Sequence, residues 1–236
     1  MNLNNAKVLI TGGSSGLGKC MAEVLSEAGA SVLITGRNEA KVQQVAQEIG
    51  CQGLAFDISD YSSLKENAAT SVQLLGGIDV LINNAGIGVF PSLGEIDLDH
   101  LQSIFGTNVF GLTLLTQEFL PYFKKQKKGN IINIASTAAL KGFARGTVYA
   151  ASKFAVRGLT QCWQAELRKE NIRVMLVNPS EVPTAFNQSD RMERPDEAQK
   201  LSALEIAHSI KAALEMDDRG FIPELSVWAT NPWINN

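Results

Sequence analysis

Short apolar runs that end in small or turn-forming residues recur along the chain. Three of them, KVLITGG, SVLITGR and DVLINNAG, are variants of one pattern. The predicted strands are Lys7–Gly13, Ser31–Arg37, Asp79–Gly86, Asn130–Ser136 and Ile172–Pro179, with Gly53–Phe56 and Arg219–Val227 as weaker members. Brief apolar runs of this kind are typical of parallel strands that are buried on both faces. The spacing between them is irregular, so the pattern is not a solenoid repeat.

The segments between these runs have helical character. In Asn38–Ile49 the apolar residues Val42, Val45, Ala46 and Ile49 share one helical face. The predicted helices are Leu17–Ala28, Asn38–Ile49, Tyr61–Leu75, Leu98–Phe123, Val148–Glu170 and a last one that starts at the capping box Ser202-x-x-Glu205 and runs through Met216. Alternating strands and helices predict an α/β, three-layer, doubly wound fold. We expect a mostly parallel seven-stranded sheet with helices on both faces, in a single domain over residues 1–236, because no linker divides the chain.

Composition narrows the classes of partner. The chain has 236 residues, 45% of them hydrophobic, and a net charge of -3 with both signs scattered. This gives no basic footprint for nucleic acid, and no apolar run is long enough to cross a bilayer. The N-terminal segment lacks the layout of a signal peptide. Cys20, Cys51 and Cys162 are widely spaced, which fits reduced thiols in a cytoplasmic protein. With only His100 and His208, a histidine-rich metal site is not expected.

The segment TGGSSGLGKC, Thr11–Cys20, fits two phosphate loops. From Gly13 it is one residue short of a mononucleotide P-loop, because Cys20 stands where a magnesium-binding Ser or Thr belongs. From Gly12 it is a dinucleotide-binding turn. In that turn Gly12 permits the tight bend, and Gly16 and Gly18 let backbone approach a pyrophosphate. The helix that follows would direct its N–H groups at the phosphates. Either glycine match is weak alone, and the rest of the chain decides between them.

The rest of the chain resembles the short-chain dehydrogenase/reductase family, in the branch with a Tyr-x-x-x-Lys active site. The resemblance runs from Lys7 to about Trp228. Its segments, in family order, are TGGSSGLG, AFDIS, NNAG, GTNVFG, NIAS, YAASK and NPSEVPT. It implies a Rossmann fold, a nicotinamide dinucleotide cofactor, and a small carbonyl or alcohol substrate. Family members are mostly homodimers or homotetramers that pair through the two long helices, here Leu98–Phe123 and Val148–Glu170.

Tyr149 and Lys153 carry the predicted chemistry. They are four residues apart in a helical stretch, so both side chains lie on one face. A free phenol loses its proton near pH 10, and a nearby ammonium is expected to lower that pKa. Such a tyrosine can act as general acid and base on a carbonyl oxygen. Without the surrounding motifs, a half-buried core tyrosine and a solvated lysine would be the simpler interpretation.

Two further residues complete the catalytic set. Ser136 ends a strand at the carboxyl edge, where open sheets bind ligands, and it would hold the substrate carbonyl. A turn cap is its alternative role, and Thr137 is a nearby competitor. Asn108 is an unusual residue in an apolar helical run, where asparagine competes with helix hydrogen bonds. The resemblance implies that Asn108 kinks the helix and anchors a water that relays protons to Lys153; local packing is the alternative.

Cofactor choice depends on the end of the second strand. An acidic side chain there would favour NAD, but the chain has Gly36 followed by Arg37. A guanidinium can bind a 2′-phosphate, so the sequence predicts NADP(H), with Ser14 as a second contact. The resemblance adds Asp57 at the adenine, Asn84 beside the adenosine, and Pro179 and Thr184 near the nicotinamide. The full predicted cofactor set is Gly12, Ser14, Ser15, Gly16, Leu17, Gly18, Arg37, Asp57, Ile58, Asn84, Ala85, Gly86, Tyr149, Lys153, Pro179, Val182 and Thr184.

Two segments depart from the family pattern or vary within it. The family usually has Pro-Gly after the sixth strand, whereas this chain has Pro179-Ser180, and losing glycine restricts the backbone. The charged stretch at about residues 184–199 resembles the substrate lid and offers little apolar surface for a large lipid. Trp228 and Trp233 near the C-terminus are expected to lie against a second subunit or against the domain's own core.

The resulting hypothesis is an NADP(H)-dependent carbonyl reductase or alcohol dehydrogenase. A non-catalytic NADP(H)-binding redox sensor is the alternative from another class, although such a protein would be expected to lose Tyr149, Lys153 or Ser136. An enoyl reductase spaces its tyrosine and lysine more widely. A P-loop ATPase would need Lys19 to contact the outer phosphates. The substrate itself is not specified by these motifs.

Overall fold

A parallel sheet forms the centre of the molecule. The computed structural model describes residues 1–184, 186, 194–195 and 197–232. Within them the strands are β1 (Lys7–Ile10), β2 (Ser31–Gly36), β3 (Gln52–Ala55), β4 (Val80–Asn83), β5 (Gly129–Ile134), β6 (Ile172–Pro179) and β7 (Glu224–Val227). They form a seven-stranded sheet in the order β3-β2-β1-β4-β5-β6-β7. Every pairing is parallel, so the sheet is all-parallel rather than mostly parallel as predicted.

The two faces of the sheet divide the core in two. Along β1, Val8 and Ile10 belong to one hydrophobic cluster and Leu9 to the other. The residues of β2 and β4 alternate in the same way, because successive side chains of a strand point to opposite faces. Both clusters are covered by helices, which is why these strands are apolar at every position instead of at every second one.

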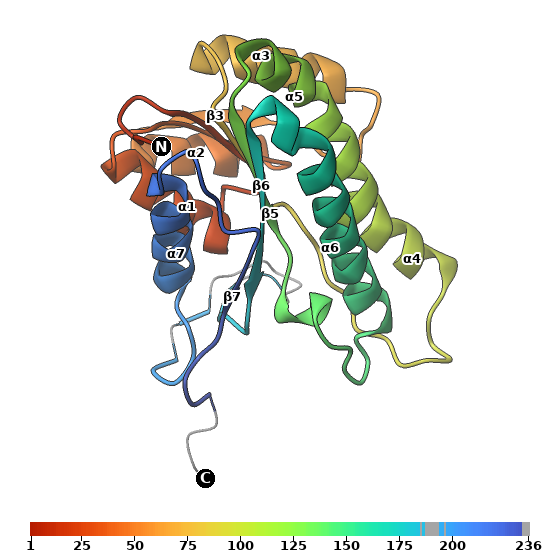
Figure 1. The fold of residues 1–236 in the computed structure, drawn as a ribbon. Coiled ribbons are helices and arrows are strands. Elements are labelled where there is room, and N and C mark those ends of the chain that lie inside the picture. The colour runs from red at the N-terminus through yellow and green to blue at the C-terminus, as the bar shows by residue number, and fades with distance from the viewer. Residues whose placement is uncertain (185, 187–193, 196, 233–236) are drawn as a thin grey trace.

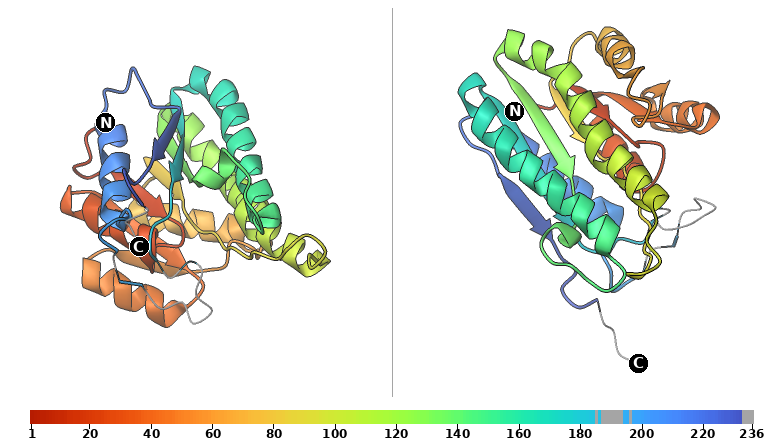
Figure 2. Two further views of the ribbon diagram at one scale, coloured as in Figure 1. Left: turned by 90° about the horizontal axis from the view of Figure 1, so that it is seen from below. Right: turned by 90° about the vertical axis from the view of Figure 1, so that its right-hand side faces the viewer.

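The helices form the outer layers. They are α1 (Gly16–Glu27), α2 (Glu39–Ile49), α3 (Leu64–Leu75), α4 (Leu98–Phe105), α5 (Leu112–Gln126), α6 (Thr147–Leu167) and α7 (Ala203–Glu215). Short 3-10 turns, η2 (Thr137–Ala139) and η3 (Arg168–Glu170), flank α6. Helices α1, α2 and α7 pack on one face, and α3, α5 and α6 on the other (Figures 1 and 2). The predicted three-layer, doubly wound fold is confirmed, and the predicted capping box of Ser202 and Glu205 begins α7.

One predicted helix is interrupted. The sequence predicts a continuous helix over Leu98–Phe123, but α4 and α5 are separated by a π-helical turn, η1 (Gly106–Gly111). At its end, a Cβ on Gly111 would lie 2.4 Å from the carbonyl oxygen of Ile58. Glycine therefore lets this turn contact the segment after β3. Turns of this kind interrupt α-helices most often at functional sites, and this one carries Asn108.

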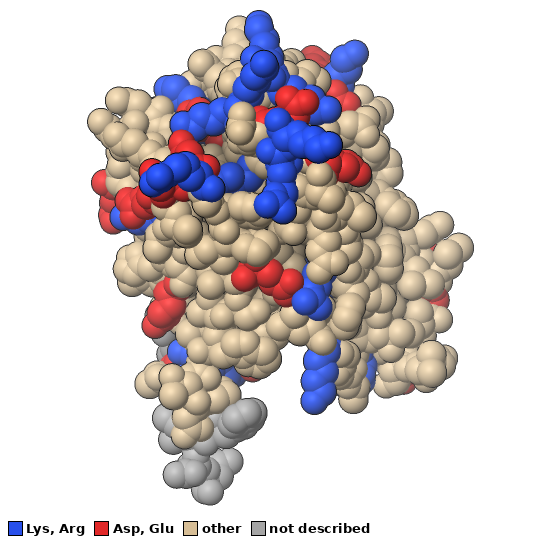
Figure 3. Space-filling model, viewed as in Figure 1, with Lys and Arg blue, Asp and Glu red and all other residues tan. Residues whose placement is uncertain are grey.

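The carboxyl ends of the strands meet at the lower end of the molecule in Figure 1. There β1 and β4 are neighbours, although β2 and β3 lie between them in the chain. The strand order therefore reverses between β1 and β4, and the topological switch point lies at the carboxyl ends of these two strands. Charged side chains of both signs gather over the opposite, upper part of the face in Figure 3, whereas its lower part is largely uncharged. None of the helices in the described ranges is long and apolar enough to span a bilayer.

Candidate active site

A cavity of about 1510 Å³ opens at the carboxyl edge of the sheet. Segments that follow β1, β2, β3, β4, β5 and β6 all contribute to its lining. Ligand pockets usually measure roughly 300–1,000 Å³, so this cavity has room for a dinucleotide together with a substrate. All of the predicted site residues line it except Gly18 and Asn108, which lie directly behind its wall. The predicted residues are thus brought together in one place.

The glycine turn after β1 is built for close backbone contact. Gly12 has a φ of +64°, and a Cβ there would lie 2.9 Å from Cα of Ala85. Gly18, in the first turn of α1, has even less space around it, since a Cβ there would lie 2.2 Å from the carbonyl oxygen of Gly12. Gly16 has a φ of +51° and faces Thr184. Glycine at these positions therefore lets the turn, α1 and the segments after β4 and β6 pack closely, which leaves the N-terminus of α1 open to phosphate groups.

Asn84 holds this turn in place. Its side-chain amide donates to the carbonyl oxygens of Thr11 (2.9 Å) and Gly12 (3.1 Å). In return, the hydroxyl oxygen of Thr11 accepts bonds from the backbone N–H groups of Asn84 and Ala85, each at 3.0 Å. These bonds tie the end of β4 to the glycine turn. Asn84 lines the cavity as the sequence predicts, and its amide N–H groups are directed at the backbone of the turn.

Charged side chains surround the far end of the cavity, beyond β2. Arg37 is 61% exposed in its side chain and approaches Asp57 with 4.0 Å between Nη1 and Oδ2. The hydroxyl of Ser14 lies across from Gly36, where a Cβ would be 2.9 Å from it, so glycine keeps this corner open. Lys41 lines the same end and was missed by the sequence reasoning, although it lies one helical turn beyond Arg37.

The lysine of the P-loop alternative is occupied elsewhere. Nζ of Lys19 lies 2.8 Å from a carboxylate oxygen of Glu48 at the end of α2. Lys19 does not line the cavity. This arrangement leaves the dinucleotide interpretation of the glycine turn as the one that the geometry supports.

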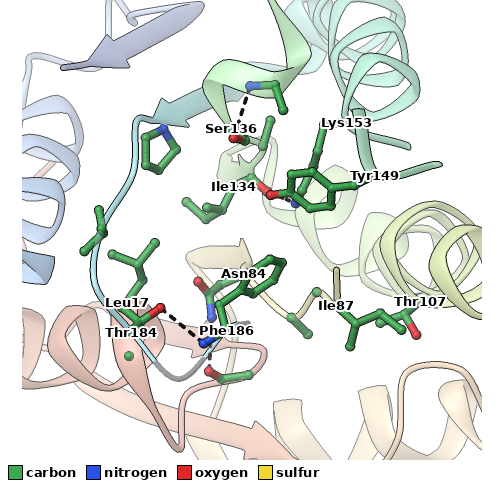
Figure 4. Close-up of a pocket in the computed structure, with 18 of the residues that line it drawn as sticks. Leu17, Asn84, Ile87, Thr107, Ile134, Ser136, Tyr149, Lys153, Thr184 and Phe186 are labelled. Carbon is green, nitrogen blue, oxygen red and sulfur yellow. Dashed lines mark hydrogen bonds between the residues drawn. The ribbon is translucent and has the colours of Figure 1, made fainter. Parts of the chain in front are cut away.

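Tyr149 and Lys153 enter the cavity from α6 (Figure 4). Both are almost fully buried, with 9% and 5% of their surfaces exposed. Nζ of Lys153 lies 5.7 Å from the centre of the Tyr149 ring and donates to the carbonyl oxygen of Ile134 at 3.0 Å. Ser136 lines the cavity close to Tyr149 (Figure 4), and its hydroxyl acts on the pKa of the tyrosine. Ser136 also caps η2, since its hydroxyl accepts from the N–H of Ala138 at 3.1 Å, which is the alternative role that the sequence allows.

Burial sets the titration of this pair. It raises the pKa of Tyr149 to about 12, and the nearby hydroxyl of Ser136 opposes this only in part. It lowers the pKa of Lys153 to about 8. The sequence reasoning expected a lowered pKa for Tyr149, and for the protein by itself that expectation is wrong. The reason is that desolvation disfavours the charged form of both groups and outweighs the attraction between phenolate and ammonium.

Asn108 connects three parts of the site from the π-turn. Its amide donates to the carbonyl oxygen of Ile87 (3.0 Å) and to the hydroxyl of Ser152 (3.1 Å), and its oxygen accepts from the N–H of Ile87 (2.9 Å). Ser152 in turn donates to the carbonyl oxygen of Tyr149. Gly86 lies beside Asn108 and Lys153, and a Cβ there would be 3.3 Å from Oδ1 of Asn108. Asn108 therefore fixes the segment after β4 against the helix that carries Tyr149.

The segment after β6 closes the other side. Pro179, Val182 and Thr184 line the cavity, and Thr184 lies near Leu17 across from Tyr149 (Figure 4). Ser180 replaces the usual glycine, but its φ is not among the positive ones and its N–H bonds to the carbonyl oxygen of Val227 at 2.9 Å. The serine thus fits this backbone. Of the predicted lid at 184–199, residues 185, 187–193 and 196 lie outside the described residues, as does Trp233.

Sequence reasoning missed the aromatic side of the cavity. Phe90, Phe143 and Phe186 line it, together with Lys141 and Arg145. These residues come from three loops that are far apart in the chain, so no local pattern joins them. Trp228 is 60% exposed and lines the mouth, so it is not buried in the domain's own core. Across the part of the chain that the structure describes, no three His, Cys, Asp or Glu side chains are placed to hold a metal ion.

Comparison with known proteins gives the family. Residues 6–195 match the short chain dehydrogenase family model. An uncharacterized oxidoreductase of Staphylococcus aureus is 31% identical over 232 residues, covering 95% of this chain and 97% of that protein. A metagenomic short-chain oxidoreductase solved with NADP has a TM-score of 0.83 at 30% identity, covering 96% and 98% of the two chains. A 3-ketoacyl-(acyl-carrier-protein) reductase of Brucella melitensis solved with NADH has a TM-score of 0.86 at 28% identity, covering 98% and 100%.

With its glycine turn, its buried Tyr149 and Lys153 and these relatives, the chain belongs to the short-chain dehydrogenase/reductase family. It is an oxidoreductase of that family.

Proposed function

We propose that the protein is an NADP(H)-dependent oxidoreductase that interconverts a carbonyl and a secondary alcohol. The observation that carries this proposal is the placement of Tyr149, Lys153 and Ser136 around one cavity whose opposite wall is the glycine cradle. The turn fits a dinucleotide, since Gly12 and Gly16 line the cavity without side chains that would keep a pyrophosphate away from the backbone. When bound, the nicotinamide supplies or accepts the hydride. Gly12, Gly16 and the N-terminus of α1 would hold the pyrophosphate, and Lys153 the nicotinamide ribose.

Tyr149 is the general acid in reduction and the base in oxidation. Because its pKa lies at about 12, its phenol keeps the proton at neutral pH and can donate it to a carbonyl oxygen. Ser136, which lines the cavity close to Tyr149, orients that oxygen beside the phenol. Asn108 positions the backbone behind Lys153 and supports the proton relay.

The preference for NADP(H) rests on charge. Arg37 and Lys41 lie at the end of the cavity beyond β2, and Ser14 offers a hydroxyl there. Asp57 lies 4.0 Å from Arg37 and forms an ion pair with its guanidinium. Two cations and a hydroxyl suit a 2′-phosphate better than a ribose hydroxyl.

Assembly and location are parts of the same proposal. Phe110, Leu114 and Phe154 are large apolar residues that remain exposed on η1, α5 and α6. Exposed apolar side chains on neighbouring helices support a homodimer or homotetramer formed through these helices. The three cysteines are free, which supports a cytoplasmic location. The one continuous seven-stranded sheet supports a single domain.

The test is an assay of NADPH and NADH oxidation at pH 7 against ketones, aldehydes, diketones and 3-oxoacyl thioesters. We expect turnover with NADPH that falls by roughly 10²–10⁴-fold in Tyr149→Phe, the range of general acid–base catalysis. Undiminished turnover in Tyr149→Phe would overturn the assignment of the acid. NADPH binding with no turnover of any carbonyl would favour the alternative, a non-catalytic NADP(H)-binding redox sensor.

A further inference from the structure

Three phenylalanine rings are clustered around Tyr149. The ring of Phe90 lies 5.3 Å from the Tyr149 ring at an interplanar angle of 58°, and that of Phe186 lies 5.6 Å away at 60°. Phe143 extends the cluster, with its ring 6.1 Å from that of Phe90. Figure 4 shows Phe186 on the same side of the cavity as Asn84, across from the Tyr149 hydroxyl. The hydroxyl thus emerges next to a wall of aromatic carbon.

Two glycines give these rings their places. A Cβ on Gly88 would lie 2.8 Å from Cε1 of Phe186 and 3.1 Å from Cζ of Phe90. A Cβ on Gly146 would lie 2.7 Å from the ring of Phe143. Neither glycine has a positive φ, so the reason for glycine here is room for the rings and not backbone conformation. The aromatic wall is therefore packed onto bare backbone at two separate points.

Arg145 fastens the loop that carries Phe143. Its Nε donates to the carbonyl oxygen of Phe90 at 2.9 Å, which joins the segment before α6 to the segment after β4. Arg145 has a φ of +65°, a conformation that costs a non-glycine residue free energy and persists only where its surroundings hold it. Phe143 nevertheless keeps 50% of its surface exposed and lines the cavity. A side chain that only filled the core would be covered.

The chemistry of this wall selects a class of substrate. Close to Tyr149, Ser136 offers a hydroxyl to a carbonyl oxygen, and Ala138, Phe90 and Phe186 pack against the tyrosine. Lys141 and Arg145 also line this side of the cavity, and Nε of Arg145 is bonded to the carbonyl oxygen of Phe90. A sugar or polyol would leave hydroxyls unpaired against these carbons, which is costly. A flat ring can meet tilted aromatic rings edge to face, a contact that is favourable beyond its buried area.

We propose that the substrate is a ketone or aldehyde whose carbonyl carbon bears an aryl group, with the ring held against Phe90, Phe143 and Phe186. This inference rests on the proposed function and names the substrate class of the same site. It assigns a role in specificity to three residues that do not touch the reacting carbonyl.

The test compares two ketones of the same size, acetophenone and cyclohexyl methyl ketone, as kcat/KM with NADPH. Conjugation makes acetophenone the less electrophilic carbonyl, so a preference for it cannot come from intrinsic reactivity. We expect acetophenone to be favoured roughly tenfold, as aromatic contacts predict. Phe143→Leu should reduce that preference toward one. The control Phe221→Leu removes a ring outside the cavity, in the segment before β7, and should leave the preference unchanged.

A binding measurement separates this inference from the proposed function. Saturation-transfer NMR on the protein gives dissociation constants for the product alcohols 1-phenylethanol and 1-cyclohexylethanol without turnover. Tighter binding of 1-phenylethanol that is lost in Phe143→Leu and in a second variant, Phe90→Leu, supports the aryl site. Equal binding of the two alcohols overturns it. Turnover of cyclohexyl methyl ketone or a polyol ketone at least as fast as acetophenone also overturns it, while the reductase assignment stands. Failure to bind NADPH and to reduce any carbonyl overturns the proposed function instead.

Discussion

The two ends of the cavity are built from different materials. At the phosphate end the contacts come from backbone, with Gly12, Gly16 and Gly18 leaving no side chain in the way, and the charged groups such as Arg37 are exposed. At the catalytic end the functional groups are side chains, and Tyr149 and Lys153 are almost completely buried. Burial shifts both of their pKa values strongly, while the exposed Arg37 stays in contact with solvent.

The two ends of the cavity should therefore differ in how well they tolerate amino-acid substitution. An exposed guanidinium can be exchanged with little effect on the fold, so cofactor choice is adjustable. A glycine wedged against backbone cannot be exchanged, and neither can a buried acid whose pKa depends on its surroundings. Substitutions at the two ends of the cavity test this difference, and those with the strongest expected effect come first.

Gly18→Ala should have the largest effect at the phosphate end. The new Cβ would lie 2.2 Å from the Gly12 carbonyl oxygen, and backbone cannot turn aside as a flexible side chain can. We expect a loss of about 1–3 kcal/mol in the free energy of unfolding, as in overpacked cores, and loss of measurable NADPH binding. Urea unfolding and fluorescence titration with NADPH measure the two.

The matched control is Gly158→Ala, in the middle of α6. A Cβ there meets nothing within 4 Å, so alanine should stabilise the helix by about 0.5–1 kcal/mol. If Gly18→Ala behaves like Gly158→Ala, the glycine turn is not the tight cradle described above.

Asn108→Ala breaks the links behind the catalytic end. It leaves the N–H and carbonyl of Ile87 without their side-chain partner and removes the donor to the hydroxyl oxygen of Ser152. An unsatisfied buried group costs about 1–3 kcal/mol, so we expect both lower stability and a drop in kcat of roughly tenfold or more. Thr113→Ala, one turn further along on α5, is the control. Equal kcat in the two variants would remove Asn108 from the site.

Much of this site follows from sequence alone. The buried strands are recognisable because both of their faces are apolar, and Tyr149, Lys153 and Ser136 lie in motifs whose order fixes their places. Asn108 was predicted as a helix kink, but the π-turn that makes the kink depends on Gly111 meeting Ile58, a contact between distant segments. Phe90, Phe143 and Phe186 come from separate loops, and the direction of the Tyr149 pKa depends on burial. No local sequence pattern indicates the aromatic cluster or the burial of Tyr149.

Arg37→Ala should change cofactor preference without touching catalysis. A hydrogen bond to a charged group contributes about 1.5–3 kcal/mol, so the preference for NADPH over NADH should fall roughly tenfold to a hundredfold. The measurement is kcat/KM for each cofactor with one ketone. Arg219→Ala, whose side chain is 90% exposed and remote from the cavity, is the charge-matched control. An unchanged ratio in Arg37→Ala would show that Arg37 does not contact the 2′-phosphate.

Lys153→Met tests how much the burial of Lys153 lowers the free energy of unfolding. The pKa of Lys153 is lowered from 10.5 to about 8 in the folded protein. Between these pH values the unfolded chain holds a proton that the folded protein has released, so stability rises as pH increases from about 8. Below pH 8 both states are protonated and the whole penalty remains. Lys153→Met removes this penalty but also loses the bond to the carbonyl oxygen of Ile134. We therefore expect a net gain of about 1–2 kcal/mol in the free energy of unfolding at pH 7.

The advantage of the methionine variant should shrink as pH rises above 8. Urea unfolding at pH 7, 8 and 9.5 measures this, and stays below the range in which Tyr149, with its raised pKa, begins to reduce stability. A difference between wild type and variant that is constant over this range would show that Lys153 does not carry a shifted pKa.

Isotope transfer is the most direct test of hydride chemistry at this site. The assay uses NADPH deuterated at the transferred position with an aryl ketone, and mass spectrometry of the product alcohol. We predict one deuterium at the former carbonyl carbon for the wild type. In Tyr149→Phe the same product should form at a rate lower by roughly 10²–10⁴-fold, while NADPH still binds. An alcohol product without deuterium, or labelled product formed as fast by Tyr149→Phe, would contradict the proposed reaction.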